Sequence, residues 1–213
     1  MLATGRGRVI GGERMKSGLV LAVALVSLCE PAFAEEVGPY VYGSGGVAVA
    51  KFNKSPVDSR VSAQYGGASV ISSVNSNPTT YKVNFGYQLL SSLGFELGYG
   101  STTSIDYSTS APVAARASEK LQIWDALVSG SYSLGAGFIL TFRGGIANLR
   151  ATGSGAIAHF SGSATEGVGG AGIKYEIDSH LSVRVDWDNG FRGPGGSQIR
   201  DVNFYSAGIG YNF

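Results

Sequence analysis

The chain has 213 residues and a formal net charge of +1, and 33 of its residues are glycine. This length suits one domain, and so small a net charge without a basic patch argues against a nucleic-acid partner. The glycines follow no Gly-X-Y period, which excludes a collagen-like chain.

Residues 1–34 differ from the rest of the chain. Four basic residues flank the start of the apolar run GLVLAVALVSLC, and small residues end the segment at Ala34. This pattern predicts a secretory signal peptide, with Met15 as an alternative initiator, and the run is too short to span a membrane as a helix. Cys29 lies within it, so the exported domain, residues 35–213, is expected to have no disulfide.

After residue 34 large apolar residues alternate with small or polar ones, and no helical period of useful length occurs. Alternation with period two predicts strands, and most of the segments have the nine to eleven or so residues that a tilted strand needs to cross a bilayer. The expected strands are residues 41–51, 80–89, 93–102, 121–132, 138–149, 166–177, 181–188 and 201–213.

The connections between these strands alternate in length. Long ones, rich in Gly, Ser, Thr, Asn and Pro, cover residues 52–79, 103–120, 150–165 and 189–200, and we expect them to be mobile loops. Short ones cover residues 90–92, 133–137 and 178–180. Short turns at one end and long loops at the other are typical of outer-membrane barrels.

The stretch YKVNFGYQLLSSLGFELGYG, residues 81–100, indicates which face is inward. Its apolar residues alternate with Lys82, Asn84, Glu96 and several glycines. Glycine has no evident use on a water-facing strand, whereas inside a narrow barrel it relieves crowding. The pattern therefore predicts an all-β, eight-stranded antiparallel up-and-down transmembrane β-barrel with its apolar face toward lipid. A secreted soluble β-sandwich is the alternative.

The aromatic residues of the expected strands fall near the two rims. Two belts are predicted, because aromatic rings with a polar edge favour the headgroup region. Tyr87, Tyr132, Phe138, Tyr175 and Tyr211 belong to the belt beside the short turns, and Tyr81, Tyr99, Trp124 and Trp187 belong to the other.

Ten charged residues share the inward face. In a hairpin centred near His180, Lys174 would face Asp186 and Glu176 would face Arg184. Because a lumen of eight strands is just wide enough for its side chains, we expect these charges to pair and fill it. They are Lys82, Glu96, Asp125, Arg143, Glu166, Lys174, Glu176, Arg184, Asp186 and Asp188.

Four segments resemble the OmpA-type transmembrane barrel: GYQLLSSLGFELGYG (86–100), FILTFRGGIANLRA (138–151), GIKYEIDSHLSVRVDWDNG (172–190) and YSAGIGYNF (205–213). The resemblance implies an interior salt-bridge network at Glu96, Arg143, Arg184 and Asp186. It also implies insertion by the barrel-assembly machinery, with Phe213 as the C-terminal assembly signal.

The sequence departs from the OmpA pattern at two places. Ser129 stands where the family's gating network has a lysine, and Lys174 stands where it has a glutamate. No peptidoglycan-binding domain follows the expected barrel. The chain therefore resembles the short, barrel-only relatives of the OmpX and opacity types, which are surface proteins linked to adhesion, serum resistance or membrane integrity.

These patterns predict a non-catalytic protein of the Gram-negative outer membrane, exported by its signal peptide, with a structural or surface-interaction role. Expected partners are outer-membrane lipid, lipopolysaccharide, and a host or surface ligand at residues 52–79 and 103–120. No cofactor or metal is expected. The first alternative is a small porin-like channel with narrow gated conductance.

The second alternative is a lipid A-modifying enzyme that uses His180 and Ser182 of the motif HLS. It is disfavoured because His180 falls in a short turn at the periplasmic rim, whereas that chemistry needs the outer-leaflet end.

Overall fold

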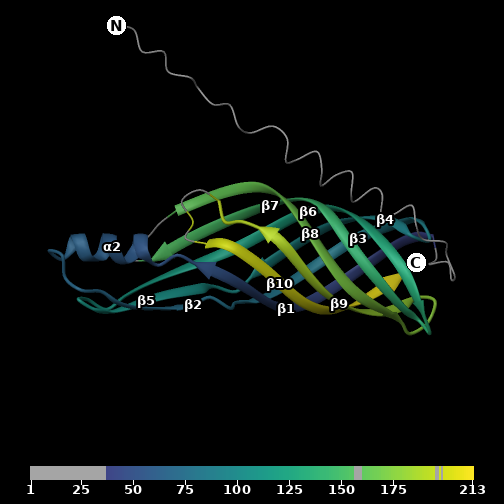
Figure 1. Cartoon of the computed structure of the whole chain (residues 1–213), viewed down its shortest axis with the longest axis horizontal. Coiled ribbons are helices and arrows are strands. Elements are labelled where there is room, and N and C mark those ends of the chain that lie inside the picture. Colours follow the sequence, from purple (N-terminus) through teal and green to yellow (C-terminus); the bar gives the residue numbers. More distant parts are fainter. Residues whose placement is uncertain (1–36, 156–159, 195–196, 198) are drawn as a thin grey trace, which may run out of the picture. The chain divides into compact units, whose positions relative to one another are not determined.

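The computed structural model describes residues 37–155, 160–194, 197 and 199–213, and their strands form an antiparallel sheet that closes on itself (Figure 1). Each strand pairs with the next in the ring, and the last pairs with the first, so the wall leaves no edge. The predicted all-β, eight-stranded barrel is confirmed. Its strands are β1 (Gly38–Phe52), β3 (Thr79–Leu90), β4 (Leu93–Thr102), β6 (Ala115–Gly135), β7 (Phe138–Gly155), β8 (Phe160–Glu176), β9 (Leu181–Phe191) and β10 (Ile199–Asn212).

The predicted signal peptide, residues 1–34, lies outside the described residues. Among the residues that are described, no helix has the length and apolar character needed to cross a membrane.

Three tight turns define one end of the barrel. Leu90 pairs with Leu93 across a two-residue turn, and Gly135 pairs with Phe138 across another. The second turn places Ala136 and Gly137 at positive φ, of 52° and 81°, as in the type I′ turns that match the twist of paired strands. The third turn joins β8 to β9.

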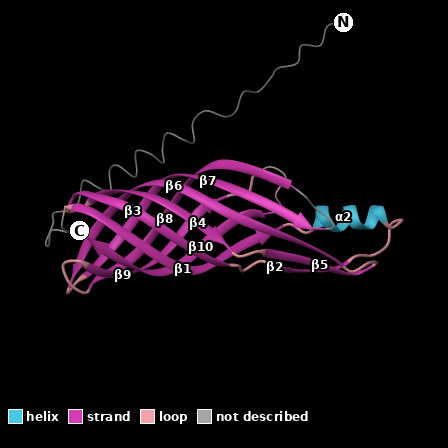
Figure 2. Ribbon diagram, turned by 180° about the vertical axis from the view of Figure 1, so that it is seen from behind, coloured by secondary structure: helices cyan, strands magenta, loops and turns pink. Residues whose placement is uncertain are grey.

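The expectation of mobile loops at the opposite end is wrong for three of the four connections. Within residues 150–165, strand β7 continues to Gly155 and strand β8 begins at Phe160. Residues 52–79 contain helix α2 (Ser55–Gln64) and strand β2 (Ile71–Asn75), and residues 103–120 contain strand β5 (Ile105–Ala111) (Figure 2). The helix was missed because only Val57 and Val61, one turn apart, are buried on it. Two apolar residues over ten give no visible helical period.

Strands β2 and β5 extend the wall beyond the ring on the long-loop side. Strand β5 pairs with the first residues of β6, β2 pairs with β5, and β6, β7 and β8 continue alongside them. We call this five-stranded part, β2-β5-β6-β7-β8, the platform. Its outward face carries a serine ladder in which Ser73 contacts Ser108 and Ser118 contacts Ser154.

The interior of the long-loop half is mainly apolar, although Thr80, Thr102 and Glu119 are also buried there. The sequence patterns did not predict this apolar filling. Leu121, Ile123 and Leu149 point inward there and are almost fully buried. We call this cluster the apolar plug; it also receives Phe52 and Val74 at its border. Its members are Ala48, Ala50, Ile105, Leu121, Ile123, Leu127, Ala147, Leu149, Ala151, Val168, Phe191, Ile199, Val202 and Phe204.

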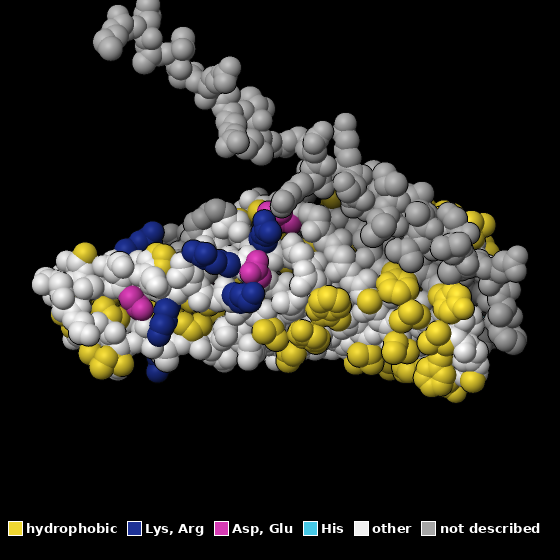
Figure 3. Space-filling view, in the orientation of Figure 1, with side chains coloured by type: hydrophobic (Ala, Val, Ile, Leu, Met, Phe, Trp, Pro, Cys, Tyr) yellow, Lys and Arg dark blue, Asp and Glu magenta, His cyan; other side chains and the backbone are white. Residues whose placement is uncertain are grey.

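The outer face of the other half is the apolar face that the sequence predicts. Phe85, Leu97 and Val185 are 66%, 65% and 63% exposed although each is fully apolar. Figure 3 shows hydrophobic side chains gathered over this half, while Lys, Arg, Asp and Glu side chains lie over the half that carries β2, β5 and α2. An apolar band around a closed ring of strands is the surface of a membrane-spanning barrel.

Helix α2 is attached to the platform through one buried tyrosine. The Tyr107 hydroxyl donates a hydrogen bond of 2.5 Å to Asp58 Oδ1. Burial, and then this bond to a carboxylate, raise the pKa of Tyr107 to about 12. A neutral phenol is the bonding form, so the attachment is complete below pH about 10 and is lost as the pH rises through about 12.

Replacing Tyr107→Phe is therefore expected to loosen α2 without opening the ring. Loss of one hydrogen bond of about 1 kcal/mol corresponds to about fivefold faster amide exchange in the helix. Hydrogen–deuterium exchange measured on residues 55–64 tests this, with the exposed Tyr65→Phe as control. Unchanged exchange in Tyr107→Phe would show that α2 is held by Val57 and Val61 alone.

Candidate functional site: the charged layer inside the barrel

The short-turn half of the lumen is filled by side chains that carry charge. Seven of them are in mutual contact and nearly free of solvent, and we call these seven the charged layer. They come from β3, β4, β6, β7 and β9, which lie on all sides of the lumen. They are Lys82, Glu96, Asp125, Arg143, Arg184, Asp186 and Asp188.

Glu96 accepts the largest number of contacts in this layer. Arg184 Nη1 lies 2.8 Å from its Oε1, and Arg143 Nη1 lies 3.5 Å from its Oε2. The Tyr40 hydroxyl donates to Oε1 at 2.9 Å, and Asn84 Nδ2 donates to Oε2 at 2.7 Å. The carboxylate is thus held by two cations and two neutral donors, which compensates for its complete burial.

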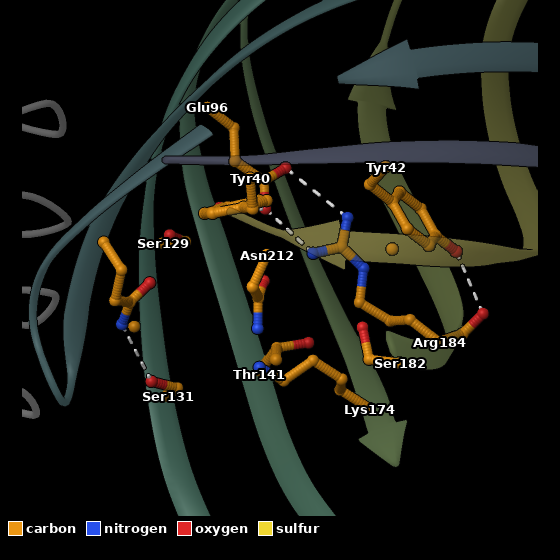
Figure 4. Close-up of a pocket in the computed structure, with 13 residues that line it drawn as sticks. Tyr40, Tyr42, Glu96, Ser129, Ser131, Thr141, Lys174, Ser182, Arg184 and Asn212 are labelled. Carbon is orange, nitrogen blue, oxygen red and sulfur yellow. Dashed lines mark hydrogen bonds and ion pairs between the residues drawn. The ribbon is translucent and has the colours of Figure 1, made fainter. Parts of the chain in front are cut away.

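Arg184 is enclosed on several sides. Its Nε donates to Asp186 Oδ2 at 2.9 Å, and its guanidinium carbon lies 4.0 Å from the centroid of the Tyr42 ring. The Tyr42 hydroxyl donates in turn to the backbone oxygen of Arg184. Figure 4 shows the guanidinium between Glu96 and Tyr42. A planar cation stacked on a ring and bound to two carboxylates has little freedom to move.

Arg143 and Lys82 extend the network toward the apolar plug. Arg143 Nη2 lies 3.0 Å from Asp186 and 2.9 Å from Asp188. Lys82 Nζ lies 2.6 Å from Asp125 and 3.9 Å from Asp188. Four carboxylates therefore share three cations, and each cation touches at least two of the carboxylates.

Glycines on the facing strands make room for these side chains. A Cβ atom added to Gly98 would overlap Asp125 Oδ1, and one added to Gly172 would overlap Asp186 Oδ1. These residues have no side chain because the neighbouring strand's carboxylate occupies the space.

The predicted pairing across the β8–β9 hairpin is wrong by two residues. Lys174 lies opposite Arg184 and Glu176 opposite Ser182. The turn is centred on Ser179 because the Asp178 carboxylate accepts the backbone N–H groups of His180 and Leu181.

Those two N–H bonds hold the pKa of Asp178 below its usual value. Because the turn sets the register, opposite charges pair along each strand instead of across the hairpin. Lys174 contacts Glu176 at 3.1 Å, two residues along β8.

A small polar cavity lies between the charged layer and the short turns. Its volume of about 30 Å³ is enough for a water molecule. Gln88, Ser131, Ser182 and Lys174 line it together with Glu96. A second cavity of about 20 Å³ lies where the charged layer meets the apolar plug, beside Asp125, Phe191 and Phe204.

Three members of the network were not singled out from the sequence. Tyr40 and Tyr42 face the lumen, whereas most tyrosines of the strands face outward. Their position in β1, two residues apart and out of phase with Val41, was a signal that could have found them. Asn84 shares its face with Lys82 and has only a neutral side chain, so a search for charges passed over it.

The predicted belt residues lie on the outer surface. Near the short turns, Phe138 packs on Tyr175 at 4.8 Å, and Tyr211 packs between His180 and Phe213. Toward the long-loop side, Tyr99 packs on Trp124 at 4.6 Å, and Trp187 pairs with Tyr205 across the strands. The belts also include Tyr81, Tyr87 and Tyr132, which are about half exposed, and Phe213, which is 70% exposed.

The motif HLS does not assemble a catalytic pair. The His180 ring is exposed in the turn, where Nδ1 contacts Ser179 Oγ at 2.9 Å. Ser182 is buried and lines the polar cavity inside the barrel. Within the described part of the chain, no group of three or more His, Cys, Asp or Glu side chains is placed to hold a metal.

A comparison with protein families matches residues 19–213 to the outer membrane protein β-barrel domain. The chain belongs to this family. Its short-turn end is therefore the periplasmic end, and its platform lies on the extracellular side of the outer membrane. A search of curated proteins gave no match.

Three solved structures share the fold at low sequence identity. Neisserial surface protein A has a TM-score of 0.59 at 13% identity, covering 83% of this chain and 97% of that one. Ail, the attachment invasion locus protein of Yersinia pestis, has a TM-score of 0.52 at 13% identity, covering 84% and 100%. OprG of Pseudomonas aeruginosa has a TM-score of 0.50 at 14% identity, covering 84% and 98%. The resemblance to OmpA-type outer-membrane barrels is confirmed.

Neutralising Glu96 is expected to cost more stability than neutralising Asp188. Each Glu96 oxygen accepts at least two donors. Whichever oxygen the amide nitrogen of Glu96→Gln replaced, it would therefore face donors that it cannot accept. We expect a loss of about 3 kcal/mol in the free energy of unfolding. Asp188→Asn removes the surplus carboxylate and leaves Arg143 with Asp186 and Glu96.

Urea unfolding in phospholipid vesicles, followed by the gel mobility of unheated samples, measures both free energies. An Asp188→Asn variant that lost as much stability as Glu96→Gln would contradict the unequal roles assigned to the two carboxylates.

Proposed function

We propose that this protein is a closed, non-catalytic barrel that anchors an extracellular platform for contacts at the cell surface. The observation that carries the proposal is the occupied lumen: a charged layer and an apolar plug lie in series along the same axis. A scaffold does not need an open lumen. The platform extends on the extracellular side, where contacts with other surfaces occur.

Both layers oppose the passage of ions, but by different physical means. Ions that reach the charged layer meet groups that are already paired with one another, and separating Arg184 from Glu96 would leave buried charges without partners. Beyond it, Leu121, Ile123 and Leu149 offer no polar group, so an ion would have to shed its water there. A narrow gated channel is therefore the less favoured function.

The platform supports the surface role. It is built from paired strands, and Ile105, Leu121 and Leu149 on its inward face belong to the apolar plug, so it is rigidly continuous with the barrel. Rigid elements present side chains in fixed positions, which favours recognition over a mobile loop. Neisserial surface protein A and Ail, both fold relatives, carry names that refer to the surface or to attachment.

The lipid A-modifying alternative is disfavoured by the positions of His180 and Ser182. The His180 side chain lies on the outside of the periplasmic turn and the Ser182 side chain lies inside the lumen. A nucleophile and its base must be within hydrogen-bond reach, and Ser182 instead lines a cavity beside Arg184. Deacylation of lipopolysaccharide that disappears in His180→Ala would revive the enzyme.

The series arrangement predicts that removing either layer alone leaves the barrel closed. We expect no sustained openings at the nanosiemens scale in planar bilayers for the wild type, for Glu96→Ala with Arg184→Ala, or for Phe191→Ala with Phe204→Ala. Openings are expected only when all four substitutions are combined. Heat-modifiable gel mobility checks that each variant is folded. Conduction by either double variant would show that a single layer holds the barrel closed.

The surface role predicts that the distal part of the platform is dispensable for the barrel. Replacing residues 53–77 by a short turn removes α2 and β2 and leaves every ring strand in place. We expect normal gel mobility, and loss of adhesion by bacteria that express the variant, measured against cells with an equal amount of wild-type protein. Retained adhesion would place the contact elsewhere or argue against a surface role.

A further inference from the structure

Exposed cations are confined to the extracellular half of the described chain. Eight lysine and arginine side chains are exposed, all beyond the apolar band, whereas the periplasmic turns carry none. The same half contains five carboxylates, one of which, Glu119, is buried. The half is therefore net positive in a molecule whose total charge is close to zero. The eight cations are Lys51, Lys54, Arg60, Arg116, Lys120, Arg150, Arg192 and Arg200.

Two of these cations stand directly above the outer aromatic belt. Trp124 is opposite Asn148, and the next outward row pairs Gln122 with Arg150. At about 3.3 Å per residue, Arg150 lies about 7 Å along the strand beyond the tryptophan row. Lys120, one row further, is the diagonal neighbour of Arg150. Because Trp124 marks the depth of the membrane interface, both cations lie at the height of headgroups.

Lys120 and Arg150 have no counter-ion among the described residues, unlike Lys51, which pairs with Asp201. Arg150 has no carboxylate in an opposite or diagonal outward position, and Lys120 has only Asp106 diagonal to it, with which it forms no ion pair. Because like charges side by side on a sheet oppose folding slightly, an external anion explains the pair better than stability does. The surface around them is polar and suited to an oxyanion: Gln122, Thr152 and Ser163 occupy the adjoining outward positions and are exposed.

We propose that Lys120 and Arg150 bind a phosphate group of lipopolysaccharide in the outer leaflet that surrounds the barrel. Their outward direction and their height above Trp124 favour a lipid that lies against the wall over a soluble polyanion that approaches the platform from above. An arginine and a lysine with neighbouring hydroxyl and amide groups can satisfy several phosphate oxygens at once. This site is separate from the adhesive role of the distal platform, and neither depends on the other.

The test uses the two tryptophans of the chain. In a Trp187→Phe background Trp124 is the single tryptophan and lies beside the proposed site. The refolded protein in zwitterionic detergent is titrated with diphosphoryl lipid A, and Trp124 fluorescence reports binding. Each Lys or Arg near a membrane surface contributes enough that Lys120→Gln with Arg150→Gln is expected to weaken binding by about tenfold or more. Dephosphorylated lipid A with the same acyl chains is expected to bind the Trp187→Phe parent and its Lys120→Gln, Arg150→Gln variant equally weakly.

The matched control is Lys54→Gln with Arg60→Gln, which removes the same charge from α2 and the residue that caps it, outside the strands that carry the aromatic belt. We expect it to bind diphosphoryl lipid A like the parent protein. If the two double variants lost affinity for diphosphoryl lipid A equally, net charge alone would explain the effect and the proposed site would be overturned. Equal binding of the two lipid A forms by the parent protein would overturn the phosphate contact. Tighter binding of heparin than of lipid A, abolished by Lys120→Gln with Arg150→Gln, would assign the surface to a soluble polyanion instead.

Discussion

The width of the lumen is the constraint on which the rest of this structure depends. A ring of eight strands encloses little more than its own side chains, so whatever points inward must fit beside what the facing strands send in. Gly98 and Gly172 show the consequence: each faces a carboxylate that occupies the place of its missing side chain. Part of the high glycine content of the chain is thus a property of its interior.

Within that width the chain fills the lumen with two chemistries. The periplasmic half holds cations and carboxylates in contact, and the extracellular half holds leucine, isoleucine and phenylalanine. The two layers stabilise the interior in different ways. The apolar plug stabilises by excluding water, whereas the charged layer is stable only while each group keeps its partners. The plug also supports the platform, because Ile105 of β5 and Leu121 of β6 belong to both.

Sequence patterns predict the ring but only part of its filling. Alternation with period two shows which residues face lipid, as at Phe85 and Leu97, and loop lengths show which end is which. The apolar plug escaped prediction because Leu121 and Ile123 alternate just as lipid-facing residues do, and period alone cannot tell an inward apolar face from an outward one. Helix α2 and strand β5 escaped because their burial depends on contacts such as Tyr107 with Asp58, far apart in the sequence.

The charged layer shows why pairing rules based on charge alone fall short. Carboxylates outnumber cations in the charged layer, so salt bridges cannot satisfy every oxygen, and at Glu96 neutral donors supply the remainder. Tyr40 and Asn84 take that role at Glu96, which gives a reason for their inward position in β1 and β3. The two departures from the OmpA pattern, Ser129 and Lys174, both line the polar cavity, where Lys174 pairs with Glu176 two residues along its own strand.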